Sequence, residues 1–328
     1  MVGQLDASEW RYFAKGNANV LLQNKSDSRK LLRLRQYKPS DYQSTIDIYR
    51  YINSIIAVIL KDFVVPMELL ELSPTFSNGI SNLLKTENRN CDIETQEKYG
   101  ILMDNCLSGV IQTFSTGKFA KLHISNDSVT LELKPKWLDP TITTLYCRNC
   151  ANEKHYEKSS SRNFCSSRLL SKDKSVVLGT VRDIFRSLQA KIDTSLYEKI
   201  LFQYFVSASE DQNILQLLSV FQNQNDNRKL IKTLESEKDV TDDLLLGMAL
   251  RDVTIFFKFI ELDDKSSNSK HVRGNEFILG QNRLLIKVVD IDNKSAKKWK
   301  YWKDTECELL DSKEFDELDL SWGPGCVL

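Results

Sequence analysis

The stretch DVTIFFKFI, residues 252–260, begins with an aspartate and continues as a run of β-branched and aromatic residues. Side chains of this kind favour a strand, which we predict over 254–260. A second strand pair, or one long bent strand, is expected over 277–289, with Asp290 at its end. The polar residues 263–275 are expected to form a hairpin loop. One carboxylate therefore stands just before a β-hairpin, and another stands at the end of that hairpin.

A second segment, LELKPKW (residues 131–137), alternates apolar and charged residues within a strand expected over 129–137. Residues two apart lie on the same face of a strand, so Glu132, Lys134 and Lys136 are expected to share one face. Ammonium groups bind phosphate oxygens as point charges. Alternating lysines also occur on solvated strand faces, and a proline fits an edge strand of that kind. The pattern alone leaves both interpretations open.

Two carboxylates, Asp290 and Asp292, follow the apolar strand over 285–289. Carboxylate oxygens in such a place hold Mg²⁺, which in turn bridges phosphate groups. An ordinary turn carboxylate is the alternative. Taken with the lysines of 131–137, the two aspartates favour transfer of a phosphoryl group to an acceptor that is already strongly anionic.

The composition is that of an ordinary globular enzyme, with 328 residues of which 41% are hydrophobic and 27% are charged. Basic and acidic residues number 45 each, so an anionic partner has to be bound by a local cluster rather than by a global field. The apolar run 55–60 is far shorter than the ~20 residues of a membrane span, and we expect no signal peptide. We expect a monomer without a membrane or direct nucleic-acid partner.

The seven cysteines are an odd number and are mostly isolated, which favours a reducing compartment. We therefore expect the protein in the nucleus, the cytoplasm or both. His123 and His271 are expected at the surface or in turns.

One cysteine pair has the spacing of a metal site. Cys147 and Cys150 form a Cys-x-x-Cys, and His155 and Cys165 could complete a tetrahedral zinc site with them. Free cysteines in a reducing cell are the alternative. A redox function is disfavoured, because no thioredoxin-like strand and helix surround the pair.

Apolar periodicity divides the chain into two parts. Strands are expected in the first part at 12–15, 20–22, 31–35 and 100–105, together with a helix over 41–60. Helices are expected in the second part at 181–192, 196–206, 214–221 and 244–250. The predicted fold is α+β with two lobes: a small N-terminal lobe (1–105) with an antiparallel sheet and a helix, and a larger α/β C-terminal lobe (106–328) with a helical part.

Protein kinases share this order of parts, with a base aspartate, a hairpin and then a metal-binding aspartate. A glycine turn between two strands, followed by a basic residue on the next strand, fits the same plan. The chain resembles one kinase family more closely, the inositol-pentakisphosphate 2-kinases, and in particular their short fungal members. Five blocks in the family's order carry this resemblance: Gly16-Asn17-Ala18-Asn19, residues 131–137, Cys147-Arg148-Asn149-Cys150, residues 250–254 and residues 290–294.

The resemblance implies a two-lobed kinase-like fold and one reaction. ATP would phosphorylate the axial 2-hydroxyl of inositol 1,3,4,5,6-pentakisphosphate, giving inositol hexakisphosphate (phytate). The chain departs from the family pattern at Asn17, where a second glycine is usual, and at Ser295, where a proline is usual. The family's histidine and lysine after the cysteine pair also do not align cleanly here, so no substrate lysine is assigned from that block.

The catalytic residues follow from the same resemblance. Asp252 would orient or deprotonate the 2-hydroxyl, whereas a helix-end aspartate paired with Arg251 is the structural alternative. Asp290 would bind Mg²⁺ with help from Asp292. Lys134 would bridge the γ-phosphate and the acceptor.

The expected inositol phosphate contacts are Lys136, Lys294, Lys298 and Trp302. The last three are spaced four apart and would form one face of a helix. A solvated charge run is the alternative for these lysines.

The expected ATP contacts lie mainly in the first lobe. The backbone of the glycine turn would cover the phosphates, and Arg33 would contact them in the place of a kinase lysine, a role that Arg35 could exchange. The full set is Gly16, Asn17, Ala18, Asn19, Arg33, Met103, Asp104 and Asn105, with Glu132 from the second lobe.

Two further functions stay open. The chain could be another inositol polyphosphate kinase or a small-molecule kinase of similar plan. It could also be an inactive kinase fold that senses inositol phosphates, although binding alone needs neither Asp252 nor Asp290.

Overall fold

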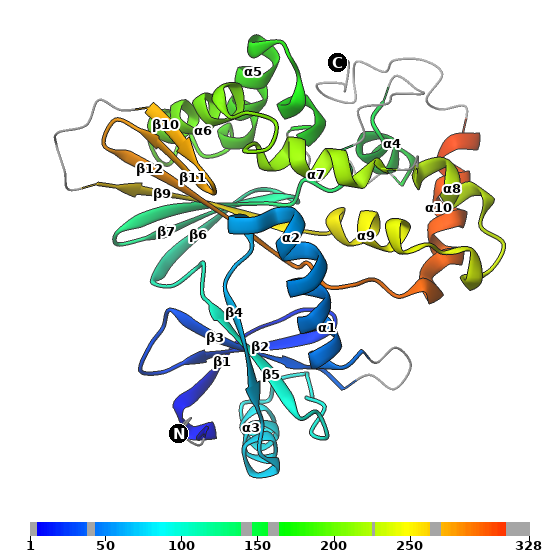
Figure 1. Ribbon diagram of the computed structural model, residues 1–328. Coiled ribbons are helices and arrows are strands. Elements are labelled where there is room, and N and C mark those ends of the chain that lie inside the picture. Colours follow the sequence, from blue (N-terminus) through cyan, green and yellow to red (C-terminus); the bar gives the residue numbers. More distant parts are fainter. Residues whose placement is uncertain are drawn as a thin grey trace. The chain divides into compact units, whose positions relative to one another are not determined.

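The computed structural model describes residues 5–37, 43–138, 146–156, 164–224, 227–262 and 270–312. The chain separates into two compact units, Met1–Gly109 and Val110–Leu328. Each unit contains one antiparallel sheet with helices beside it, so the fold is α+β with two units (Figure 1). The predicted α+β class is thereby confirmed.

The sheet of the first unit has the strand order β1-β2-β3-β5-β4. Its strands are β1 Trp10–Lys15, β2 Asn19–Asn24, β3 Lys30–Arg35, β4 Met67–Glu71 and β5 Tyr99–Asp104. The helices are η1 Ala7–Glu9, α1 Thr45–Tyr51, the π-helical turn η2 Ile52–Ile56, α2 Ala57–Leu60, η3 Lys61–Phe63 and α3 Pro74–Thr86. The helix predicted over 41–60 is therefore present from residue 45, and residues 41 and 42 lie outside the described ranges.

The core of the first unit lies between the sheet and α3. Val20, Leu22 and Leu32 point to one side of the sheet, and Ile80 and Leu84 meet them from the helix. The two helix residues are four apart and so lie on one face. Ser73 caps the start of α3 by accepting a hydrogen bond from the Phe76 N–H at 3.1 Å.

The second unit has a seven-stranded sheet in the order β10-β11-β12-β9-β8-β7-β6. Its strands are β6 Val110–Gly117, β7 Ala120–Ser125, β8 Ser128–Leu133, β9 Thr254–Glu261, β10 Lys270–Arg273, β11 Glu276–Leu279 and β12 Asn282–Val289. Residues 277–289 thus belong to the strand pair β11–β12. The loop predicted over 263–275 is wrong for β10, because that strand pairs with β11; residues 263–269 lie outside the described ranges.

Helices of the second unit gather on a face and at one end of this sheet (Figure 1). They are α4 Arg148–His155, η5 Ser166–Leu170, α5 Lys174–Phe185, α6 Ser195–Ser207, α7 Ile214–Gln222, α8 Asn227–Thr233, η7 Glu237–Asp239, α9 Asp242–Leu250, η8 Ala296–Lys298 and α10 Trp299–Asp311. The helix predicted over 181–192 starts earlier and ends at Phe185. Asp173 sets the start, because its carboxylate caps the Ser175 N–H at 2.7 Å.

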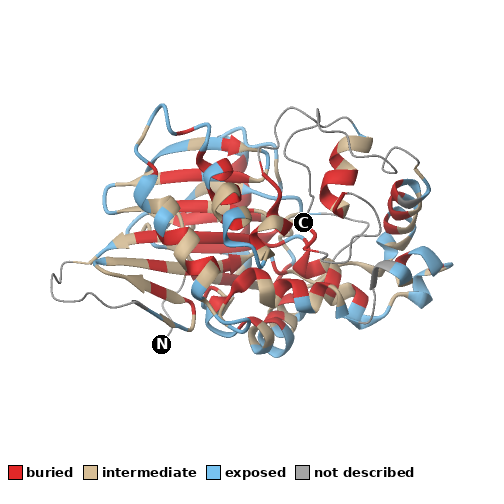
Figure 2. Ribbon diagram, turned by 90° about the horizontal axis from the view of Figure 1, so that it is seen from above, coloured by how far each residue is buried: buried red, intermediate tan, exposed pale blue. Residues whose placement is uncertain are grey.

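Aromatic side chains join α6 to the middle of the sheet, where buried residues run along the strands (Figure 2). Tyr204 on α6 lies with its ring centroid 6.1 Å from that of Phe257 on β9 and 6.0 Å from that of Phe277 on β11. The Tyr204 hydroxyl donates to the Gln212 carbonyl and accepts from the Ile214 N–H, each at 2.9 Å. Burial raises the pKa of this hydroxyl.

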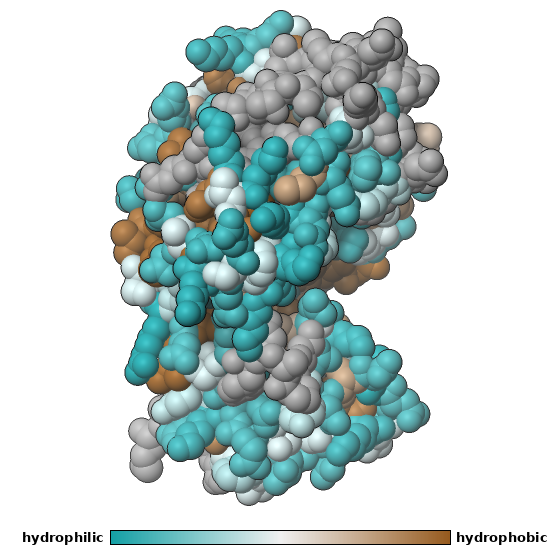
Figure 3. Space-filling view, turned by 90° about the vertical axis from the view of Figure 1, so that its right-hand side faces the viewer, coloured by the Kyte–Doolittle hydropathy of each residue, from teal (hydrophilic) through white to brown (hydrophobic). Residues whose placement is uncertain are grey.

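The described surface carries both charged and apolar groups. In Figure 3 hydrophilic atoms cover most of it, and hydrophobic atoms occur in separate groups. Among the described residues, no helix is long and apolar enough to cross a membrane.

Replacement of Tyr204 by phenylalanine is expected to lower the free energy of unfolding by about 1–3 kcal/mol, because it leaves the half-buried Gln212 carbonyl and the buried Ile214 N–H without their partner. Urea unfolding measures this difference. Tyr301→Phe is the matched control, since Tyr301 is 69% exposed and should be neutral. Equal stability of the Tyr204 variant and the native chain would contradict the assigned hydrogen bonds.

Candidate functional site

The neighbouring strands β8, β9 and β12 each have one end at the same edge of the seven-stranded sheet. This edge is formed by the ends of strands and not by an outer strand. Ile255 near the start of β9 pairs with Leu133 at the end of β8 and with Val288 near the end of β12. Because all these pairs are antiparallel, the chain leaves β8, enters β9 and leaves β12 at one edge. This register brings together the segments after Leu133, before Thr254 and after Val289.

Asp252 lies at the centre of this edge, in the short connection between α9 and β9. Its Oδ1 accepts from Lys136 Nζ at 2.7 Å, and its Oδ2 accepts from Lys294 Nζ at 2.8 Å. Burial raises the pKa of Asp252, but the charges and hydrogen bonds of Lys294 and Lys136 outweigh it and lower the pKa to about 2. The carboxylate side chain is 53% exposed, so it is open to a ligand while both its oxygens are held.

The lysine segment is not a strand along its whole length. β8 ends at Leu133, and Lys136 has a φ of 60°, a left-handed conformation. The prediction that Glu132, Lys134 and Lys136 share one strand face is therefore wrong. The reason is that Asn149 on α4 takes over the backbone of this segment, since its side-chain amide donates to the carbonyls of Pro135 and Trp137 and accepts from the Trp137 N–H.

The Lys134 backbone N–H still donates to the Phe119 carbonyl, at 2.8 Å. Within the described residues, its ammonium group makes no ion pair and no hydrogen bond. The charge of Lys134 helps to lower the pKa of Glu132, whereas Lys136 forms an ion pair with Asp252.

Trp137 anchors the end of the lysine segment in the helical part. The guanidinium carbon of Arg251 lies 3.7 Å from its ring centroid, and that of Arg148 lies 4.4 Å from it. Trp302 belongs to the same buried cluster and is only 7% exposed, which leaves little of its side chain for a ligand.

Asp290 follows β12 directly and adopts a φ of 63°. Its Oδ2 accepts from the Thr254 hydroxyl at 2.6 Å, so the start of β9 orients this carboxylate. Two residues on, Asp292 is half-buried, and the neighbouring Asn293 Oδ1 is buried without a hydrogen-bond donor among the described residues. The segment therefore collects oxygen atoms of the kind that a hard cation takes as ligands.

The shared helical face of Lys294, Lys298 and Trp302 is not formed. Lys294 precedes the 3₁₀ turn η8, and α10 begins only at Trp299, with Lys298 at its cap position. Lys294 instead turns to Asp252, whereas Lys298 is exposed. The i, i+4 spacing predicts a shared face only within a helix, and α10 begins after both lysines.

Three thiols meet at the start of α4. The Sγ atoms of Cys147, Cys150 and Cys165 lie within 4.8 Å of one another, and all three residues are buried. His155, the predicted fourth ligand, is not in this group, because it ends α4 at ~12 Å along the helix axis from Cys147. The described residues thus supply three ligands of the predicted four.

In the first unit, the glycine turn joins β1 to β2. The Gly16 N–H donates to the Asn19 carbonyl at 2.9 Å, and Asn19 Oδ1 accepts from Arg35 at 3.1 Å. Arg33 and Arg35 lie on β3 and are both buried, at 8% and 7% exposure.

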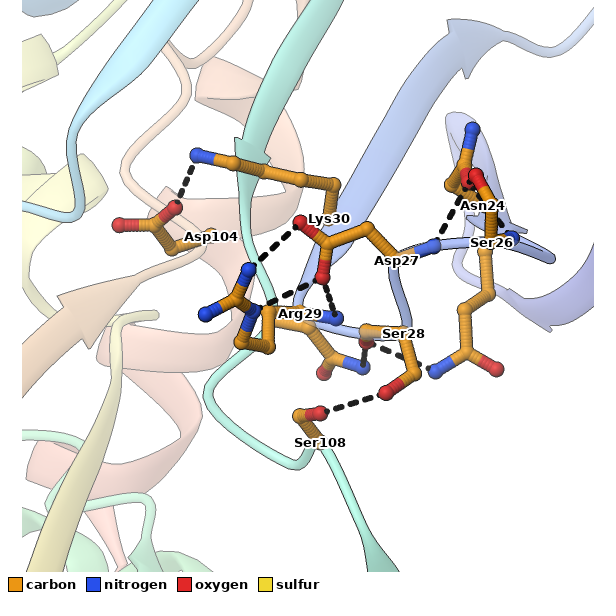
Figure 4. A network of polar contacts seen from close by, with 10 residues as sticks. Asn24, Ser26, Asp27, Ser28, Arg29, Lys30, Asp104 and Ser108 are labelled. Carbon is orange, nitrogen blue, oxygen red and sulfur yellow. Dashed lines mark hydrogen bonds and ion pairs between the residues drawn. The ribbon is translucent and has the colours of Figure 1, made fainter.

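The residues of the predicted adenine connector lie at the other end of this sheet. Asp104 pairs with Lys30 at 2.6 Å beside the β2–β3 turn, where Asp27 binds Arg29 (Figure 4). Asn105 donates to the Ser28 carbonyl at 2.9 Å. Met103, one residue earlier, is 8% exposed on β5.

Glu132 has a partner that the sequence did not indicate. A carboxylate oxygen of Glu132 forms a hydrogen bond with His123 Nε2, at 3.0 Å. His123 Nδ1 forms a second one with the Thr113 hydroxyl, at 2.9 Å. Burial raises the pKa of Glu132, but His123 and Lys121 lower it overall. His123 is 6% exposed on β7, so its predicted surface position is wrong, whereas His271 is exposed.

Comparison with known proteins decides the family. The sequence model described as inositol-pentakisphosphate 2-kinase matches residues 12–233 and 188–308. The chain belongs to the inositol-pentakisphosphate 2-kinase family. This confirms the resemblance drawn from the five sequence blocks.

Curated relatives agree over nearly the whole chain. The inositol-pentakisphosphate 2-kinase of Debaryomyces hansenii is 29% identical, with 92% of this chain and 90% of the relative aligned. The protein of the same name from Saccharomyces cerevisiae is 26% identical over 92% of this chain and 96% of its own length. That from Yarrowia lipolytica is also 26% identical, over 98% and 96%.

Two residues of this family member were missed in the sequence. Asn149 was noted only as part of the cysteine block, and Gln222 lies just beyond the helix predicted over 214–221. Their side chains form hydrogen bonds with backbone groups of the lysine segment. The spacing of residues in the sequence does not predict hydrogen bonds of this kind. The one available signal concerned Gln222, which is an amide residue at the end of an apolar helix.

Replacement of Lys294 by methionine is expected to raise the pKa of Asp252 from about 2 towards its ordinary value of ~3.9. In the native chain, the stabilisation from ionised Asp252 is present above the ordinary pKa and is lost as the pH falls towards 2. NMR titration of the aspartate carboxyl carbons measures the change. Lys298→Met is the control, and an equal shift in both variants would contradict the pairing.

Proposed function

We propose that this chain transfers the γ-phosphoryl group of ATP to the 2-hydroxyl of inositol 1,3,4,5,6-pentakisphosphate, giving ADP and inositol hexakisphosphate. In this step the 2-oxygen forms a bond to the γ-phosphorus, and the bond from that phosphorus to the bridging oxygen of ADP breaks. The hydroxyl proton passes to a carboxylate. The names of the curated relatives support this assignment.

One observation carries the proposal. Asp252 is held between two ammonium groups at the sheet edge where the oxygen-rich segment 290–293 also begins. A base, cations for an anionic acceptor and oxygen ligands for a metal therefore converge within the second unit. Phosphoryl transfer in kinases needs these three kinds of group.

Asp252 is the residue that would receive the hydroxyl proton. As paired here its pKa is about 2, which makes it a weak base. The phosphates of the acceptor compete for the same two ammonium groups, because phosphate oxygens carry more charge than one carboxylate. When Lys136 and Lys294 bind those phosphates, the pKa of Asp252 rises and the carboxylate accepts a proton more readily.

The segment 290–293 fits Mg²⁺. Asp290 offers an exposed carboxylate, Asp292 a second one, and Asn293 a buried oxygen that accepts no hydrogen bond from the described residues. All three are oxygen donors, as this cation prefers. Held by these residues, Mg²⁺ would offset the negative charge of the ATP phosphates. Lys134 is the cation that would contact the γ-phosphate.

We infer that the first unit binds ATP, as the N-terminal lobe of a protein kinase does. The glycine turn and the segment 103–105 lie at opposite ends of β3, which spans ~17 Å from Lys30 to Arg35. A nucleotide extended along this strand would have its phosphates at the turn and its adenine at the other end. Arg33 lies on β3 between the two ends. The nucleotide contact predicted at Glu132 stays a prediction.

Asp252→Asn is expected to lower kcat by about 10²–10⁴-fold, because the amide cannot accept the hydroxyl proton. Transfer of phosphate from ATP and Mg²⁺ to inositol pentakisphosphate measures kcat, and calorimetry measures whether the acceptor still binds. Asp304→Asn on α10 is the matched control, since Asp304 is exposed and pairs only with Lys300 among the described residues.

The same assay separates the other functions. Faster transfer to a lower inositol phosphate would make the chain another inositol polyphosphate kinase. Binding of inositol phosphates without transfer to any acceptor, unchanged by Asp252→Asn, would make it a sensor and overturn the proposed reaction.

We also propose that the three thiols hold Zn²⁺. Ligand sulfurs around tetrahedral zinc lie about 3.8 Å apart, given Zn–S bonds of about 2.3 Å. The Sγ atoms of Cys147 and Cys165 are 3.5 Å apart, and Cys150 completes the group within 4.8 Å. Zinc would fix the start of α4, next to Asn149.

Elemental analysis is expected to find about one zinc per chain, as for a structural site. Cys150→Ser should lower the zinc content and the melting temperature together, because metal binding adds directly to folding stability. Cys91→Ser, outside the group, is the control. A native chain free of zinc when purified without chelators would refute this site.

A further inference from the structure

Gln222 lies at the last residue of α7 and is 1% exposed. Its Nε2 donates to the carbonyl of Lys136 and to the carbonyl of Leu250, each at 3.0 Å. Its Oε1 accepts from the Leu138 N–H at 2.7 Å. One buried amide thus joins the segment that carries Lys136 to the segment that leads into Asp252.

These two segments lack regular partners for their backbone groups. Lys136 lies beyond the end of β8, and Leu250 ends α9 two residues before Asp252. Buried carbonyls of this kind need a donor. The two N–H groups of one amide supply both, so the two carbonyl oxygens cannot lie further apart than twice 3.0 Å.

The ion pair between Lys136 and Asp252 cannot fix this geometry alone. Their side chains are 29% and 53% exposed, and ion pairs with this exposure hold their partners weakly. The buried Gln222 amide makes three hydrogen bonds, and the Gln222 backbone carbonyl adds a fourth from Arg251, at 2.8 Å. The hydrogen bonds of Gln222 therefore constrain the positions of Lys136 and Asp252 more strongly than their own ion pair does.

We propose that Gln222 is a positioning residue, which sets the distance between Lys136 and Asp252 for catalysis without contacting the substrates. This inference rests on the proposed phosphoryl transfer. Gln222 acts through the two backbone segments, so its loss affects the relative placement of cation and base rather than the affinity for ATP.

The same helix end offers matched controls. Ser219 Oγ and Asn223 Nδ2 donate to the Leu138 carbonyl, at 2.7 and 2.9 Å. Both bind the lysine segment two residues beyond Lys136, and among the described residues neither side chain forms a hydrogen bond with the segment before Asp252. A purely structural contribution from this helix end is therefore shared by all three residues, whereas the link between the two segments belongs to Gln222.

Gln222→Met has nearly the same length but no donor, and Gln222→Asn keeps the amide but is one methylene too short to reach both carbonyls. Each is expected to lower kcat, by about 10²-fold for the methionine variant, with an unchanged KM for ATP. Asn223→Ala is expected to lower the melting temperature while kcat is retained. Gln222→Asn serves as the test if the methionine variant does not fold.

Two further measurements separate positioning from mere stability. In a Lys136→Ala background, Gln222→Asn should cost much less in kcat than in the native chain; equal losses in both backgrounds would overturn the proposal. NMR titration gives a readout without catalysis, because Gln222→Asn should raise the pKa of Asp252 and Asn223→Ala should not.

The two proposals fail in different ways. If the native chain transfers no phosphate to any inositol phosphate, the proposed function fails, while the titration still tests the link between Gln222 and Asp252. If the native chain is active and Gln222→Asn matches Asn223→Ala in kcat and in the pKa of Asp252, the positioning role fails alone.

Discussion

The pairing of β9 with both β8 and β12 is the constraint on which the site depends. Ile255 is held in register with Leu133 on one side and Val288 on the other, and all three are buried. A slip of β9 by one residue would turn Phe257, which packs under Tyr204, to the opposite face of the sheet. The aromatic core therefore fixes the register, and the register places Asp252 beside the lysines and Asp290.

The meeting of three strand ends at one edge leaves backbone groups there without partners in the sheet. Backbone groups beyond Leu133 and before Thr254 lose their sheet partners, and buried polar groups of this kind are destabilising unless they find others. Asn149 and Gln222 provide these partners from helices α4 and α7, and the second of these is distant in the sequence. Helices α4 and α7 thus belong to the site although neither carries an expected substrate contact.

In the described part of the second unit, the non-glycine residues with a positive φ lie at this same edge. Lys136 and Asp290 both adopt left-handed conformations that are unfavourable for residues with side chains. Such conformations persist where the surroundings over-determine them. Lys136 is held by Gln222 through its carbonyl, and Asp290 by the Thr254 hydroxyl through its carboxylate.

The sequence predicted what depends on local pattern. The strands around 254–260 and 284–289, the helix over 45–60 and the two-part α+β fold all follow from periodicity, because burial repeats with the period of each element. The family followed from short blocks whose order is unlikely to arise by chance. The resemblance implied that Asp252 and Lys134 act on one acceptor, whereas the bonds of Asp252 to Lys136 and Lys294 were not predicted.

What could not be predicted depends on contacts between distant segments. The alternation of LELKPKW continues past Leu133, but the amides of Asn149 and Gln222 bind the backbone groups that follow the end of the strand. His123 reads as a polar surface residue, and its burial follows from Glu132 on the neighbouring strand. Lys294 and Lys298 have helical spacing, yet Lys294 binds Asp252, which lies 42 positions earlier in the chain.

The equal numbers of basic and acidic residues bear on the role of Asp252, which is paired with two lysines. With 45 basic and 45 acidic residues, no global field concentrates a polyanion, so the cations at the site have to do so locally. Two ammonium groups close together repel each other unless an anion lies between them. Asp252 provides that anion when no acceptor is bound. The phosphates of the acceptor compete for the same cations and carry more charge than the Asp252 carboxylate. Binding of a heavily phosphorylated acceptor would thus itself release the base, whereas water offers no charge that could do so.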